Sequence, residues 1–161
     1  MVILIEILVL CVVFTLMVCI MAKNPIATLF NYPPKIQERV KSLPEYKDKI
    51  PTTKNMVFTK LLAATVMVII ISLILRYING YTTFMEALVN SYLIWTVVNI
   101  YDVIVMDILW FCQDKRFVFK GTEDMVDEYH NYWFHIKGGI IGQVIGAVVC
   151  VVVGLVIHFI L

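Results

Sequence analysis

Charged residues are scarce in this chain of 161 residues, of which Asp, Glu, Lys and Arg make up only 16%. An ordinary soluble domain has about 25%. The formal net charge is +1, which excludes nucleic-acid binding driven by a strongly basic surface. Residues of the set AVILMFWYC account for 61% of the chain, which excludes a disordered protein. The composition therefore indicates a membrane protein with little sequence left for a soluble domain.

The familiar sequence signatures of catalytic and cofactor sites are also missing. The 4 cysteines form no CxxC pair, so neither a zinc ribbon nor a thioredoxin-like site is indicated. The chain has no nucleophile elbow, phosphate-binding loop or dinucleotide fingerprint. The sequence motifs therefore predict no cofactor.

Four stretches are apolar and long enough to cross a bilayer, which takes about 20 residues in a helix. They are residues 2–22, 56–75, 88–112 and 138–161. Lys and Arg are concentrated in the first and third connections, whereas the second connection holds only Arg76. Because basic loops stay in the cytoplasm, we expect these two connections inside and both termini outside. The sequence thus predicts an all-α polytopic membrane protein, a single four-helix transmembrane domain over residues 1–161.

Two segments of the basic connections have the pattern of helices that lie on the membrane surface. In residues 34–43, Ile36 and Val40 recur at helical spacing while basic residues occupy other faces. A proline-rich connector with solvated charges is the alternative. Residues 122–137 open with a helix start at Thr122 and end in aromatic residues typical of the headgroup level.

Small residues recur every four positions along the last predicted span. The glycines of this stripe are Gly138, Gly142, Gly146 and Gly154. Small side chains allow a second helix backbone to approach closely inside a membrane. We predict a helix-packing face, which either closes the bundle internally or joins two subunits.

Polar side chains also interrupt the predicted spans, where ionisable groups are costly and commonly functional. We predict one cluster in the cytoplasmic half, in which Lys60 pairs with an aspartate. Its members are Lys60, Asn99, Asp102, Asp107 and Gln143. On an ideal α-helix, residues five apart lie about 140° apart, which argues against a site that pairs Asp102 with Asp107. The cluster is either a structural ion pair with hydrogen bonds, or a cation or proton site, because two acids and one base leave one carboxylate over.

A second candidate group precedes the last span. Asp127 and His130 are three residues apart, which can place two ligands on one helix face, and His135 and Lys137 follow. This group can contact a lipid headgroup or a metal ion, and solvated interfacial residues are the alternative.

The last two predicted spans and their connection carry a family resemblance. It lies in residues 95–102 (WTVVNIYD), 121–125 (GTEDM) and 132–138 (YWFHIKG). With these runs the chain is similar to a family of small four-span bacterial integral membrane proteins that has no known activity. The resemblance implies a multi-pass protein of the bacterial cytoplasmic membrane, and it implies no substrate.

Three functions fit these observations. The first is a protein, or a subunit of a larger system, that handles an ion or small solute through Asp102 and Asp107. The second is an interfacial enzyme acting on a lipid or lipid-linked substrate, with an aspartate as base and His130, His135 or Lys137 at the headgroup. The third is a structural assembly partner. Because the chain is small for a complete transporter, we expect it to act in the lipid bilayer as a homo-oligomer or with another membrane subunit. We expect no nucleic-acid partner.

Overall fold

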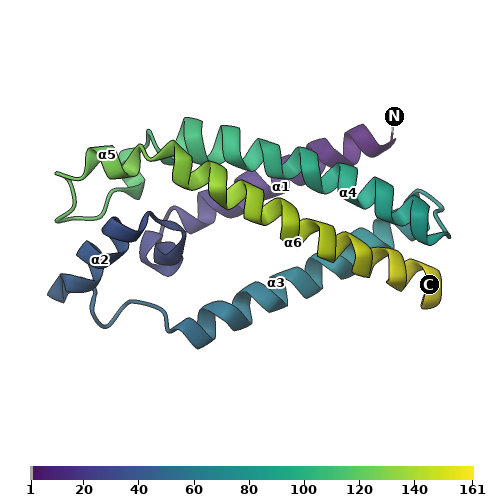
Figure 1. Cartoon of the computed structure of the whole chain (residues 1–161), viewed down its shortest axis with the longest axis horizontal. Coiled ribbons are helices and arrows are strands. Elements are labelled where there is room, and N and C mark those ends of the chain that lie inside the picture. Colours follow the sequence, from purple (N-terminus) through teal and green to yellow (C-terminus); the bar gives the residue numbers. More distant parts are fainter. Residues whose placement is uncertain (1) are drawn as a thin grey trace.

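The computed structural model describes residues 2–161, and within that range the chain contains helices and no strand. Four helical segments are long and apolar enough to cross a membrane, and they run along the longest axis of the molecule (Figure 1). They span Val2–Met21, Thr53–Ile78, Phe84–Phe111 and Val126–Phe159. The chain is therefore an all-α polytopic membrane protein. Each of the four predicted spans corresponds to one of these segments, with ends that differ by at most four residues except at the start of the fourth, which the sequence placed at Gly138 and which here begins at Val126. Met1 lies outside the described range.

Two of the spans change from α-helix to π-helix at their C-terminal ends. The elements of the spans are α1 (Val2–Met21), α3 (Thr53–Leu73) with η3 (Ile74–Ile78), α4 (Phe84–Tyr101) with η4 (Asp102–Phe111), and α6 (Tyr132–Phe159). The start of α4 is fixed by a reciprocal cap, in which Thr83 accepts from the Glu86 N–H and Glu86 accepts from the Thr83 N–H. The link before it turns at Gly80, whose φ of +73° favours glycine.

The central contact of the bundle is made by α4 and α6, which lie along one another (Figure 1). α1 packs on α4, and α3 packs on α6. Their buried apolar core is formed by Ile7, Ile71, Leu75, Ala87, Ile94, Val153 and Ile157. The N-terminal half of α3 diverges from α4 and α6, whereas both chain termini and the link between α3 and α4 lie together at the opposite end (Figure 1).

The two basic connections, residues 22–52 and 112–131, pack together into a structure that we call the cap. It contains η1 (Pro25–Asn31), α2 (Pro34–Ser42), η2 (Pro44–Tyr46), η5 (Lys115–Phe117) and α5 (Val126–Tyr129). Its buried core is formed by Ala22, Ile26, Leu29, Tyr32, Ile36, Val40, Phe117, Phe119 and Tyr129. The cap therefore has a core of its own, distinct from the core of the bundle.

The cap corrects both predicted surface helices. α2 is a helix, as the spacing in residues 34–43 predicted, but Ile36 and Val40 are buried in the cap core. Helical structure in residues 122–137 is interrupted, because α5 ends at Tyr129 and α6 begins at Tyr132. The Thr122 hydroxyl does not cap a helix: it is buried and bonds the Phe119 carbonyl.

Hydrogen bonds stabilise the second connection of the cap and join it to the first. The Tyr129 hydroxyl accepts from the Phe119 N–H at 3.0 Å and lies 2.7 Å from the Thr122 hydroxyl. The Tyr46 hydroxyl accepts from the Lys120 N–H at 3.1 Å. Arg39 donates to the Gly121 carbonyl, and Lys35 forms an ion pair with Glu128. The contacts of Lys35, Arg39 and Tyr46 hold α2 and η2 against the connection between the third and fourth spans.

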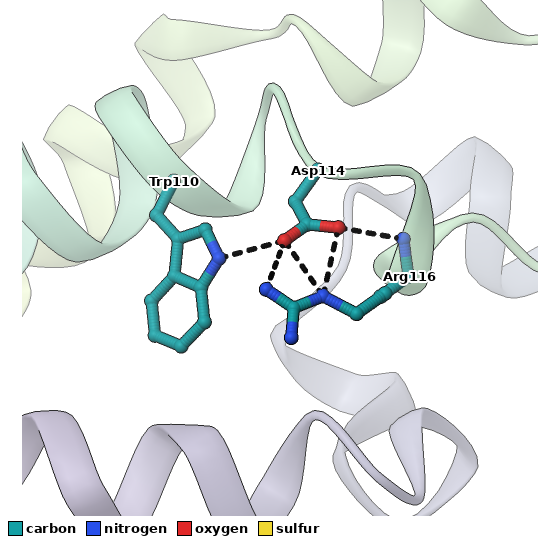
Figure 2. Close-up of polar contacts among 3 residues, drawn as sticks. All are labelled: Trp110, Asp114 and Arg116. Atoms are coloured by element: carbon teal, nitrogen blue, oxygen red, sulfur yellow. Dashed lines mark hydrogen bonds and ion pairs between the residues drawn. The ribbon is translucent and has the colours of Figure 1, made fainter.

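Asp114 organises the turn at which the third span enters the cap (Figure 2). Its carboxylate accepts from the Trp110 indole N–H at 2.8 Å and from the Arg116 backbone N–H at 2.9 Å. The Arg116 guanidinium also bonds this carboxylate and holds the pKa of Asp114 well below its usual range. The turn therefore sets the point at which the chain leaves the third span and enters the cap.

Candidate functional site

The π-helix η4 contains both Asp102 and Asp107. A π-helix bonds residue i to residue i+5, so residues five apart follow one another on the same face. One of these bonds runs from the Cys112 N–H to the Asp107 carbonyl at 2.9 Å. Asp102 accordingly lies within electrostatic reach of Asp107. The ideal α-helix on which the expected separation of the two carboxylates rests is therefore not the helix found here.

His135 reaches this site from α6. Its Nδ1 lies 3.2 Å from Asp107 Oδ2, and its side chain is only 3% exposed. The rings of Phe111 and Phe134 enclose the imidazole, with centroids 5.1 and 5.4 Å from its own. Nε2 is buried and has no hydrogen-bond partner among residues 2–161. Asp107 thus orients the imidazole, and the second nitrogen remains free to take a proton or a ligand.

We call Asp102, Asp107 and His135 the ion site. Lys60 does not join it, although the sequence predicted a pairing with an aspartate. Lys60 is exposed, and none of the ion pairs in the described part of the chain involves it. The physical reason is that the half of α3 which carries Lys60 diverges from α4 and α6 (Figure 1). An imidazolium balances only one of the two carboxylates, so the other needs a proton or another cation at membrane depth.

A layer of amide side chains lies one turn away from the ion site. Asn99 donates to the Gly139 carbonyl at 3.0 Å and to the Gln143 side-chain oxygen at 3.2 Å. Gln143 in turn donates to the Thr96 hydroxyl at 2.7 Å. These bonds cross between α4 and α6 and border a shallow cavity of about 500 Å³. The structure thus brings Asn99 and Gln143 together, in a layer that contains no charged group.

The glycine stripe of α6 faces α4, so it closes the bundle internally. Side chains built at Gly142, Gly146 and Gly154 would overlap, in that order, Asn99, Trp95 and Phe84. The Trp95 indole N–H donates to the Gly142 carbonyl at 3.2 Å. Gly138 does not belong to this face: nothing lies within 4 Å of a side chain built there, and Gly139 faces Val103 instead. A four-residue repeat drifts around a helix of 3.6 residues per turn, which moves Gly138 out of the contact.

The structure separates the residues predicted to contact a headgroup or a metal ion. His135 is buried in the ion site, whereas Asp127, His130 and Lys137 are exposed. The break between α5 and α6 falls at His130, so the helical spacing does not carry across it. In residues 2–161, no three side chains of His, Cys, Asp or Glu are placed to hold a metal ion. The predicted group is therefore not one site.

The sequence reasoning missed the contact between His135 and Asp107. Both residues lie close to the same end of the bundle, because the third span runs toward the cap and the fourth runs away from it. A comparison of the depths of Asp107 in the third span and His135 in the fourth could have predicted this contact from the sequence. The π-helix had no such signal in the sequence.

Comparisons with known proteins add no relative. No protein-family model, curated protein or solved structure matches the chain. The similarity of residues 95–138 to small four-span bacterial membrane proteins thus stays a prediction from the sequence.

Proposed function

We propose that this protein binds a proton or small cation at the ion site and handles it within the membrane, alone or as a subunit of a larger system. One observation carries the proposal. The buried imidazole of His135 is held by Asp107 and keeps Nε2 free, beside a second carboxylate in the same π-helix. Chains of acidic residues and histidines at membrane depth are typical of proton relays.

A proton is the cation that suits this group best. Nε2 of His135 can accept a proton while Nδ1 keeps facing the Asp107 carboxylate, and Asp102 is the second proton acceptor. With a neutral imidazole and two carboxylates the site carries a charge of −2. One proton on the imidazole reduces this charge to −1, and a second proton on Asp102 removes it. Each step lowers the cost of burying the site in an apolar environment.

The exposure of Asp107 supports exchange with the outside of the site. Its side chain is 31% exposed, whereas that of His135 is 3% exposed. Asp107 therefore connects the enclosed imidazole to the cap end of the bundle. A cation that enters there meets a carboxylate before it reaches the imidazole.

We place the protein in the cytoplasmic membrane of a bacterium, with the cap inside and both termini outside. The basic residues of both connections lie in the cap, which supports this orientation. Both termini lie at the opposite end of the bundle, in keeping with four spans (Figure 1). Exposed apolar residues on the diverging half of α3, among them Phe58 and Leu61, suit contact with lipid or with another membrane subunit.

A groove at the inner membrane surface that both histidines face would favour the enzyme hypothesis. His135 is enclosed in the ion site, and His130 lines a different cavity in the cap. The geometry therefore favours ion handling. No specific contact favours the role of a structural assembly partner.

The test is proton movement in liposomes that contain the purified protein and a pH-sensitive dye, driven by a potassium diffusion potential. We expect the wild type to move protons, and we expect Asp107→Asn and His135→Gln to reduce the rate at least tenfold. The matched control is Glu6→Gln, a carboxylate-to-amide change at the opposite end of the bundle, where Glu6 accepts from Asn79 at 3.1 Å. Equal rates in the wild type and both site variants would overturn the proposal.

A further inference from the structure

A second cavity of about 640 Å³ lies where the third span meets the cap. Its lining begins at Phe111 and Cys112 and ends at His130, two residues before α6 starts. Asp102, Asp107 and His135 are not among the lining residues. The cavity is therefore distinct from the ion site, and its volume is in the usual range for a small-ligand pocket.

The balance of charge around this cavity is positive. Lys115 and Lys120 both line it, and neither lysine takes part in an ion pair within the described range. Asp114 also lines the cavity, but Arg116 neutralises its charge (Figure 2). Glu123 is the other acidic residue of the lining, and its carboxylate accepts from the Gly121 N–H at 2.7 Å. With Arg116 counted, three basic side chains face two acidic ones, before any proton on His130.

Apolar side chains form another part of the lining. Phe111, Val118 and Val126 supply this wall. Phe111 is the last residue of the third span, so we expect the apolar wall to begin near the end of the apolar part of the bilayer. The cavity thus places cationic side chains next to an apolar surface at the level of the headgroups.

We propose that this cavity binds a phosphate-bearing anion, held by Lys115 and Lys120, with its less polar part against Phe111 and Val118. Lysine ammonium groups bind phosphate as strongly hydrated point charges. A phospholipid headgroup and a free phosphate ester share this chemistry. The site shares only the Phe111 ring with the surroundings of the ion site, and its charged residues are different, so the proposal does not rest on the proposed ion handling.

Native mass spectrometry of the whole protein, released from mild detergent, tests the proposal. The probes are phosphatidylglycerol, zwitterionic phosphatidylcholine and glycerol 3-phosphate. We expect the wild type to retain phosphatidylglycerol or glycerol 3-phosphate at least tenfold more than phosphatidylcholine. The double variant Lys115→Gln/Lys120→Gln should lose at least fivefold of this retention. The control Lys47→Gln/Lys49→Gln removes two exposed cap charges outside the cavity and should behave as the wild type.

The probes also identify the source of the phosphate. Retained phosphatidylglycerol that glycerol 3-phosphate does not displace supports a lipid headgroup, whereas displacement or direct binding of glycerol 3-phosphate supports a free ester. Equal retention of the anionic and zwitterionic probes would overturn the proposal, as would equal losses in the two double variants. Lys115 and Lys120 are exposed, so their variants should fold; if the double variant does not, each single variant decides in the same way.

Discussion

His135 Nδ1 and Asp107 Oδ2 lie 3.2 Å apart, across the interface between α6 and η4. This contact links the third and fourth spans at the end of the bundle that carries the cap. It also distinguishes the two imidazole nitrogens, because Nδ1 faces the Asp107 carboxylate whereas Nε2 is buried and has no hydrogen-bond partner among residues 2–161. Removing either partner should therefore affect both the stability of the bundle and the chemistry of the site.

Asp107→Ala should destabilise the protein more than Asp107→Asn does. Alanine removes the oxygen that lies 3.2 Å from the buried Nδ1, whereas asparagine retains a side-chain oxygen that can accept a hydrogen bond from it. Hydrogen bonds to charged groups contribute about 1.5–3 kcal/mol, and asparagine should restore about half of this. Unfolding by SDS titration in mixed micelles measures the difference. Equal losses in the two variants would show that the oxygen does not hold the imidazole.

Gly146→Ala should weaken the contact between α4 and α6. The added methyl group would overlap the Trp95 indole ring, and overpacking of this kind costs about 1–3 kcal/mol. Gly138→Ala is the matched control, since a side chain at Gly138 meets nothing within 4 Å. The same SDS titration compares the two variants. If Gly138→Ala is as destabilising as Gly146→Ala, then the assignment of the packing face is wrong.

Loss of the hydroxyl group should have different effects on the stability of the cap at its two buried tyrosines. The Tyr32 hydroxyl has no partner within the described residues, so Tyr32→Phe should leave stability unchanged or raise it. The Tyr129 hydroxyl bonds the Phe119 N–H and the Thr122 hydroxyl, so Tyr129→Phe should cost about 1–3 kcal/mol. Resistance to limited proteolysis of the cap reports both changes. A loss of resistance in Tyr32→Phe equal to that in Tyr129→Phe would contradict the assignment.

The Asp114 turn should make the cap sensitive to acid. Because Arg116 holds the pKa of Asp114 below its usual range, the folded cap binds this proton less readily than the unfolded chain does. The stabilisation is therefore complete above the ordinary carboxyl pKa of about 4 and is lost as the pH falls below it. Trp110 fluorescence, in a protein carrying Trp95→Phe and Trp133→Phe, follows the turn through the indole bond to Asp114.

Two variants test the origin of that acid sensitivity. Asp114→Asn should remove it, because the residue that titrates is gone. Arg116→Gln should reduce the loss of stability in acid, since the pKa of Asp114 then lies closer to its value in the unfolded chain, and it should raise the pH at which the Trp110 fluorescence changes. An unchanged fluorescence profile in Arg116→Gln would show that the guanidinium does not stabilise the turn.

The sequence was sufficient for the spans because the apolar length of a segment is a local property. It was also sufficient to mark Gly142 and Gly146 as packing positions, since their spacing and small size are visible in the chain. It was insufficient for Lys60, whose expected partners depend on how closely α3 approaches α4. The π-helix that contains Asp102 and Asp107 could not be predicted for another reason. The change from α-helix to π-helix within the third span follows no residue pattern that we could identify.

The cap illustrates a further limit of sequence patterns. The spacing of Ile36 and Val40 correctly indicated a helix with one apolar face. Whether that face meets lipid or protein depends on Phe117 and Phe119, more than 70 residues further along the chain. Such a long-range partner does not appear in local periodicity.

Infrared difference spectroscopy of the reconstituted protein, recorded while the pH is changed, tests most directly whether the ion site takes up protons as one unit. We expect a protonated-carboxyl band that Asp102→Asn removes. We also expect the pH at which this band disappears to change in both Asp107→Asn and His135→Gln, since Asp102 lies within electrostatic reach of both residues. Glu6→Gln should leave that pH unchanged. A band that survives in Asp102→Asn, or that titrates at the same pH in all variants, would contradict the account.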